Sequence, residues 1–129
     1  MYFNEKDNFV EIQKVITRVS KLANNSDISI DALSTRDYVN TKLFEKDCEL
    51  KVFEFIGELE KLFSESYCNY LELLNLFEIN VKTIQDLFDN ERGVLIMSED
   101  LKIRKNRLNL LSLIRNYSLK IADFTLLNS

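Results

Sequence analysis

The sequence predicts an all-α fold, a single compact bundle of five or six helices around a long central helix at about residues 41–65. The chain of 129 residues has no proline and only two glycines, so it lacks the residues that the tight turns of strand-rich folds require. Apolar side chains recur at three- and four-residue steps along most of its length. A hydrophobic content of 46% and a charged content of 29% are ordinary for one globular domain. We therefore expect residues 1–129 to form a single helical domain.

The N-terminal helix is expected to begin near Asn4 or Asp7, either of which can cap it, and to end near Ala23. The polar cluster at residues 24–27 interrupts the apolar pattern that precedes it. Residues 28–33 then resemble a linker or a single helical turn.

The longest amphipathic stretch, residues 41–65, has one apolar face about 120° wide and a charged face opposite to it. The apolar face consists of Phe44, Cys48, Val52, Phe55, Ile56, Leu59, Leu62 and Phe63. The acidic residues of the charged face are Asp47, Glu54, Glu58 and Glu65. A second apolar line joins Leu43, Leu50 and Phe53 to Gly57, and a glycine inside a helix allows a neighbouring helix to approach closely. We expect this line to be a seam, either with another helix of the chain or in a homodimer.

The apolar spacing predicts a further helix over residues 67–80 and a short one from Asn80, as its cap, to Phe88. Residues 89–93 form the clearest turn of the sequence, and Gly93 is expected to have a positive φ there.

Residues 94–97 are apolar without helical spacing and are expected to be an extended, buried linker. Ser98 is the predicted cap of a last helix that ends near Leu126. This helix carries a basic tract of Lys102, Arg104, Lys105 and Arg107, which is the one feature typical of nucleic-acid binding.

The charge of the chain is unevenly distributed. Residues 27–100 hold 17 acidic and 7 basic side chains, whereas residues 101–129 hold six basic side chains and one acidic. The acidic part is either neutralised by the basic helix or free to attract a cationic partner.

Histidine is absent, which removes the commonest general base and the commonest zinc ligand. We expect no catalytic residues, no metal site and no cofactor. Cys48 and Cys68 fit no zinc pattern and are expected to be buried thiols in a reducing compartment. No apolar run is long enough for a membrane span, so the expected location is the cytoplasm.

The leading functional hypothesis is a non-enzymatic protein of the inhibitor, antitoxin or immunity type, which blocks a basic protein partner through its acidic helical surface. The partner-binding residues are then the exposed acids named above, Asp47, Glu54, Glu58 and Glu65. The first alternative is a regulator that binds nucleic acid through the basic tract, although nucleic acid is an unlikely partner for so acidic a chain. The second alternative is a self-associating structural bundle, in which the seam forms a homodimer.

Overall fold

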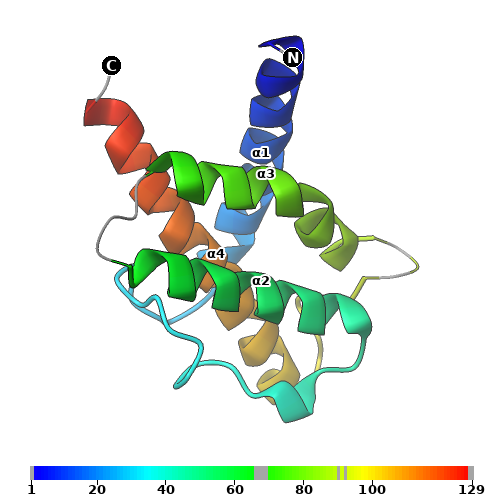
Figure 1. Cartoon of the computed structure of the whole chain (residues 1–129). Helices are drawn as coiled ribbons and strands as arrows, with labels where there is room; N and C mark the ends of the chain where they lie inside the picture. Colours follow the sequence, from blue (N-terminus) through cyan, green and yellow to red (C-terminus); the bar gives the residue numbers. More distant parts are fainter. Residues whose placement is uncertain (1, 66–69, 90, 92, 128–129) are drawn as a thin grey trace.

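The computed structural model describes residues 2–65, 70–89, 91 and 93–127. These residues form four α-helices and one turn of 3-10 helix, and no strand occurs among them (Figure 1). The elements are α1 (Tyr2–Ala23), η1 (Thr41–Leu43), α2 (Asp47–Phe63), α3 (Tyr70–Leu87) and α4 (Leu101–Leu127). The all-α class is confirmed, but the prediction of five or six helices is wrong. None of the described helices is long and apolar enough to traverse a bilayer.

The central helix is α4, which contacts α1, α2, α3 and η1. Figure 1 shows it passing behind both α2 and α3. Every residue from 106 to 114 is buried, so neighbours surround the helix over more than two turns. The prediction that residues 41–65 form the centre is therefore wrong. That stretch keeps one face exposed, whereas α4 has none over its middle turns.

Residues 41–65 also do not form one continuous helix. The backbone is extended at Phe44, with ψ of 133°, and at Lys46, with ψ of 158°. The Glu49 side chain starts α2 after this break, because its Oε1 accepts hydrogen bonds from the backbone N–H groups of Glu45 (2.8 Å) and Lys46 (3.2 Å). A carboxylate in this position satisfies donors that the helix itself leaves unpaired.

The two helices predicted on either side of Asn80 are one helix, α3. Asn80 lies inside it, and its Nδ2 donates to the backbone oxygen of Leu76 at 2.9 Å, so it does not act as a cap. The predicted start at residue 67 lies outside the described residues.

Helix α4 begins three residues later than Ser98. Asp100 is its actual cap, because its Oδ1 accepts from the N–H groups of Lys102 (2.9 Å) and Ile103 (3.2 Å). At the other end of the chain, α1 begins at Tyr2, ahead of both predicted caps.

Gly93 does not have the predicted positive φ. Its N–H donates to the backbone oxygen of Asp89 at 2.9 Å, and the next N–H, from Val94, donates to the oxygen of Leu87 at 3.0 Å. A Cβ at position 93 would lie only 2.5 Å from the Asp89 oxygen. Glycine is therefore required here by the close approach of backbone atoms.

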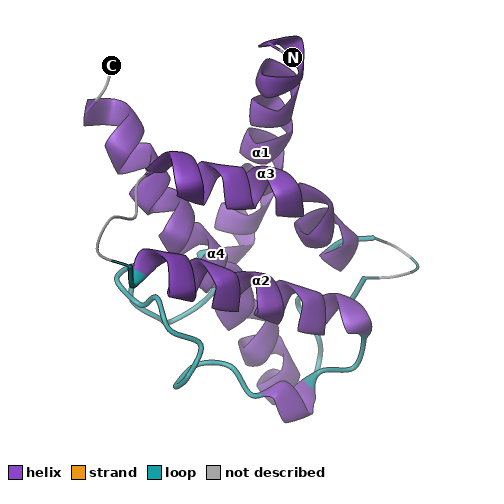
Figure 2. Cartoon of the chain, viewed as in Figure 1, coloured by secondary structure: helices purple, strands orange, loops and turns teal. Residues whose placement is uncertain are grey.

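The segment between α1 and α2 is the longest loop of the described chain (Figure 2). We call residues 24–46, including η1, the strap. Residues 28–33 make a turn, in which Ala32 N–H donates to the Ser29 oxygen at 3.2 Å, and the rest of that stretch is a linker. Ile28 and Leu33 pack against a single core to which all four helices contribute buried side chains.

Candidate functional site

The acidic residues predicted to bind a partner are all exposed: Asp47, Glu54 and Glu58 lie on α2, and Glu65 follows two residues after its end. Glu58 and Glu65 line a shallow hollow between α2 and α3, together with Lys61 and Glu72. No three side chains of the metal-ligating types come together anywhere in the part of the chain that the structure describes. The α2 face is thus a hydrated surface of mixed charge with a negative excess.

The seam of Leu43, Leu50, Phe53 and Gly57 does not contact another helix at the glycine. A Cβ built on Gly57 would have no neighbour within 4 Å, and the Leu50 side chain is 46% exposed. Leu43 and Phe53 are half-buried, and the Phe53 ring packs edge to face on Phe44, with centroids 5.8 Å apart. The prediction of helix packing at Gly57 is wrong, because none of the described elements packs against α2 at that level.

The four cations of the predicted basic tract lie in three different environments. Lys102 and Lys105 are exposed to solvent. Arg104 is half-buried, and its Nε donates to the backbone oxygen of Ser98 at 2.8 Å. Arg107 is only 4% exposed, so its prediction as a nucleic-acid contact is wrong.

Arg107 is bound within the protein on every side of its guanidinium group. Nη2 lies 2.6 Å from Glu45 Oε1, Nε lies 3.3 Å from Glu49 Oε2, and Nη1 donates to the Leu95 oxygen at 2.8 Å. These contacts join α4 to the start of α2 and to the loop that precedes α4. Arg107 and Glu49 therefore stabilise the fold and are not available to a partner.

Two buried asparagines of α4 hold the strap by hydrogen bonds to its backbone. Asn106 Oδ1 accepts from the N–H of Asn40 at 2.7 Å, and its Nδ2 donates to the oxygen of the same residue at 3.0 Å. Asn109 Nδ2 donates to the oxygen of Tyr38 at 2.7 Å. These contacts bring strap residues 36–42 against the first turns of α4.

These asparagines were not among the predicted site residues. A signal was present, because asparagine is a poor helix former and yet recurs in the middle of a long helix. The pattern alone does not show whether such a residue faces water or another segment.

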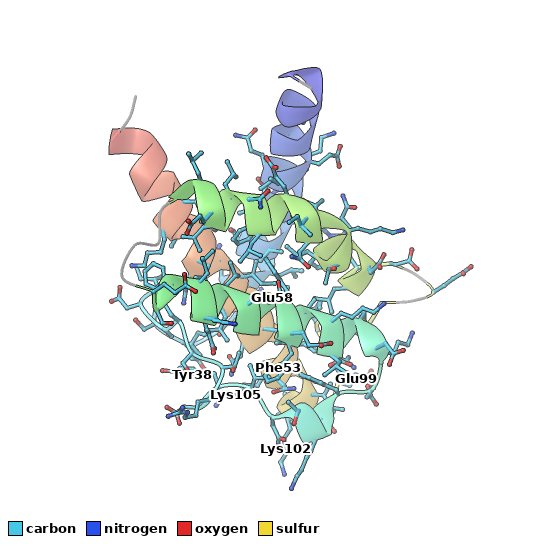
Figure 3. All side chains as sticks on the ribbon, viewed as in Figure 1. Tyr38, Phe53, Glu58, Glu99, Lys102 and Lys105 are labelled. Carbon is cyan, nitrogen blue, oxygen red and sulfur yellow. The ribbon has the colours of Figure 1, made fainter. Side chains whose placement is uncertain are left out.

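Five exposed side chains belong to the strap residues held against α4 and to the first turns of α4, and we call this set of residues the basic corner. It consists of Arg36, Tyr38 and Lys42 from the strap, with Lys102 and Lys105 from α4. Figure 3 shows Tyr38, Lys105 and Lys102 toward the same end of the molecule, with Glu58 farther away on α2. Asp37 and Glu99 are also exposed nearby in the chain, so the positive charge of the corner is moderate.

The basic corner can bind a polyanion that also carries aromatic rings. Lysine and arginine side chains contact phosphate oxygens, and a partly exposed tyrosine offers a surface on which a nucleobase can stack. The two strap cations, Arg36 and Lys42, were not among the predicted site residues, because more than fifty residues separate them in sequence from Lys102.

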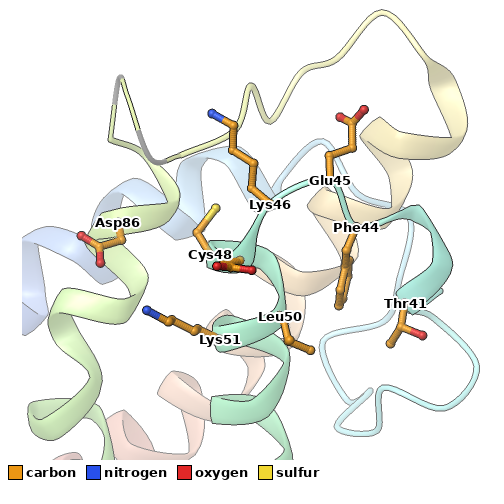
Figure 4. Close-up of a pocket in the computed structure, with 9 residues that line it drawn as sticks. Thr41, Phe44, Glu45, Lys46, Cys48, Leu50, Lys51 and Asp86 are labelled. Carbon is orange, nitrogen blue, oxygen red and sulfur yellow. The ribbon is translucent and has the colours of Figure 1, made fainter.

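A second surface hollow, of about 710 Å³, lies at the start of α2 (Figure 4). Phe44 and Leu50 form its apolar wall, and Lys51 and Asp86 lie on the other side. Cys48 also lines it but is buried, which confirms the prediction for this thiol, whereas Cys68 lies outside the described residues. Burial, with a smaller effect of the Glu49 charge, raises the pKa of the Cys48 thiol, so the group is uncharged and weakly nucleophilic near neutral pH.

Comparisons with known proteins show similarity to one named enzyme subunit. The chain is 33% identical over 116 residues to the β subunit of glycine–tRNA ligase from Gloeothece citriformis (strain PCC 7424), a match that covers 88% of this chain and 16% of that protein. The corresponding subunit of Acaryochloris marina (strain MBIC 11017) is 31% identical over 115 residues, again 88% of this chain and 16% of the relative. That of Persephonella marina (strain DSM 14350 / EX-H1) is 33% identical over 119 residues, or 91% of this chain and 15% of the relative. No family model and no solved structure matches the chain.

These relatives overturn the functional hypothesis drawn from the sequence. They are named as subunits of an enzyme that joins glycine to tRNA, so the predictions of a non-enzymatic inhibitor and of a basic protein partner are wrong. The same relatives set aside the two alternatives, which were a nucleic-acid-binding regulator and a self-associating structural bundle. They also set aside the view that nucleic acid is an unlikely partner. The chain spans only 16% of the length of the first of these relatives.

Proposed function

We propose that this chain is a helical tRNA-binding domain that acts within glycine–tRNA ligation, and that the basic corner is its RNA contact. The observation that carries the proposal is the similarity to glycine–tRNA ligase β subunits over 88% of the chain. Residues 1–129 would act as one domain, in the cytoplasm. The contribution of this domain to the reaction is to bind and orient the tRNA.

The distribution of charge supports the choice of surface. Residues 27–100 carry a large acidic excess, and the exposed acids of α2 repel phosphate. Figure 3 shows Lys102 and Lys105 toward one end of the molecule, with Glu58 farther away on α2. A polyanion is therefore attracted to one end of the molecule and repelled from the α2 face, which favours a single orientation of the bound RNA.

The test measures the affinity of the chain for a glycine tRNA transcript by fluorescence anisotropy, at salt concentrations from about 50 to about 200 mM. We expect the triple variant Lys42→Gln, Lys102→Gln, Lys105→Gln to bind more weakly. Its plot of log affinity against log salt should be less steep by about 2 to 3, because each phosphate contact contributes about 0.7 to 0.9 to that slope. Over the fourfold range of salt, the loss of affinity of the triple variant should therefore be smaller than that of the unaltered chain by a factor of about 16 to 64.

The matched control is Lys51→Gln, Lys61→Gln, Lys82→Gln, which removes the same charge from exposed positions on α2 and α3. Its salt slope should stay within about 0.5 of the unaltered chain, because phosphate contacts dominate that slope and these lysines make none. Absence of salt-dependent tRNA binding by the unaltered chain would refute the proposal. An equal effect of the two triple variants would show that the basic corner is not the contact surface.

A further inference from the structure

We infer that Asn106 and Asn109 are positioning residues for RNA binding: they hold the strap so that its cations and Tyr38 join the lysines of α4 in one surface. This inference rests on the proposed function of the basic corner. It adds that the shape of the RNA contact depends on two buried amides that touch no RNA themselves.

Asn106 makes a paired contact with the backbone of a single strap residue. It accepts from the Asn40 N–H and donates to the Asn40 oxygen, at 2.7 and 3.0 Å. The side chain is buried, so water does not compete for either bond. The two bonds fix the position of Asn40 relative to α4, and Lys42 follows two residues later. The Asn40 side chain in turn accepts from the Lys42 N–H at 3.0 Å, which continues the ordered backbone into η1.

Asn109 makes the second attachment, one helical turn farther along α4. Its Nδ2 donates to the Tyr38 oxygen at 2.7 Å, and its Oδ1 accepts from Ser26 Oγ at 3.1 Å. Ser26 Oγ also accepts from the Ile28 N–H at 3.3 Å, so Asn109 bonds to the strap both near its start and at Tyr38. The Tyr38 side chain remains exposed while its backbone is held.

Hydrogen bonds within the strap do not replace these attachments. Near Tyr38 and Asn40 the strap has local backbone bonds from Tyr38 and Val39 to the Thr35 oxygen and from Leu43 to the Asn40 oxygen. Such turns define local shape but not the position of the segment on α4. A slip by one residue moves a side chain by about 3.8 Å along the chain, which exceeds the tolerance of a phosphate hydrogen bond. The asparagines therefore determine whether the strap cations reach the same RNA as Lys102 and Lys105.

Asn116 offers a matched control on the same helix. It is buried and donates through Nδ2 to the oxygens of Ser29 (2.9 Å) and Ala32 (2.6 Å). It lies ten positions beyond Asn106, or about 15 Å along the helix axis. Loss of this attachment releases a part of the strap that carries none of the basic corner.

The experiment compares Asn106→Leu and Asn109→Leu with Asn116→Leu, at a temperature at which circular dichroism shows all three folded. We expect the first two to bind the tRNA transcript roughly tenfold more weakly, with a salt slope lower by about 1, because the strap cations no longer reach their phosphates. Asn116→Leu should lower the melting temperature about as much as the first two variants do, and should leave the affinity for the tRNA transcript unchanged. Amide hydrogen exchange should become faster over residues 36–42 in the first two variants and over residues 29–33 in the third.

Equal affinities for all three variants, or an equal loss in all three, would overturn the inference. If Asn106→Leu does not fold, Asn106→Ala replaces it, because the smaller side chain admits water to the Asn40 backbone. Failure of the proposed function is recognised separately, because it leaves tRNA affinity insensitive to Lys42, Lys102 and Lys105. In that case, faster exchange at residues 36–42 in an Asn106 variant still shows the attachment, but the role in RNA binding is refuted.

Discussion

Removing the charge of Glu49 should destabilise the fold far more than removing the charge of Glu45, although Glu45 makes the shorter contact with Arg107. The two contacts measure 3.3 and 2.6 Å. The Glu45 side chain is 59% exposed, and ion pairs with one well-hydrated partner contribute only about 0 to 1 kcal/mol. The Glu49 side chain is fully buried and Arg107 is 4% exposed. Breaking a buried pair costs about 3 to 5 kcal/mol, because the remaining charge stays out of water.

The substitution Glu49→Gln isolates the charge from the other role of this residue. Its Oε1 can still accept from the N–H groups of Glu45 and Lys46, so the start of α2 keeps its partners. Arg107 would retain only the exposed Glu45 carboxylate and the Leu95 oxygen. We therefore expect Glu49→Gln to lower the free energy of unfolding by about 3 kcal/mol, and Glu45→Gln by less than about 1 kcal/mol.

Urea unfolding followed by circular dichroism at fixed pH measures both values by linear extrapolation. A domain of this size typically has about 5 to 15 kcal/mol of stability, so both single variants should remain folded. Equal losses for Glu45→Gln and Glu49→Gln would refute the argument from burial. As a further check, Arg107→Leu should be less harmful in the Glu49→Gln background than alone, because the glutamine leaves no buried carboxylate unpaired.

Two further predictions concern the glycines and the buried thiol. Gly57→Ala should stabilise the chain by about 1 kcal/mol, because the position is helical and open. Gly93→Ala should destabilise it, because the new Cβ would lie 2.5 Å from the Asp89 oxygen. Thermal unfolding of both variants checks these predictions, and a destabilised Gly57→Ala variant contradicts the first. Because burial raises the pKa of Cys48 above its ordinary value of 9.0, the folded state holds the thiol proton more tightly than the unfolded state. The free energy of unfolding should therefore fall as pH rises above about 9, by at most about 1.4 kcal/mol per pH unit, and an unchanged slope in Cys48→Ala would contradict this.

Helical spacing in the sequence was sufficient to predict the class of the fold and the approximate position of most helices. The repeat of apolar residues predicted the bodies of α1, α2, α3 and α4, because one buried face is enough to produce that pattern. Helix ends were less predictable. The start of α2 depends on Glu49, and the start of α4 on Asp100, where several nearby polar residues are equally good caps in isolation.

The sequence did not show which helix is central. Asn106, Asn109 and Asn116 interrupt the apolar pattern of α4, so the helix resembles one with a hydrated side. In the structure these residues are buried, because their amides bond to the backbone of the strap. The spacing of apolar residues in a sequence shows only which side chains are polar and which are apolar. It does not record whether the polar partner is water or another segment of the chain.

The same limit applies to the candidate site. The sequence by itself determined that residues 102–107 carry several cations on one helix. Each of these side chains has the same charge, so the sequence does not distinguish a buried one from an exposed one. Tertiary structure alone decided that Arg107 is buried with Glu49 while Lys102 and Lys105 face solvent beside strap residues more than fifty positions away. Burial and pairing depend on contacts between distant segments, and those contacts exist only after the strap has packed on α4.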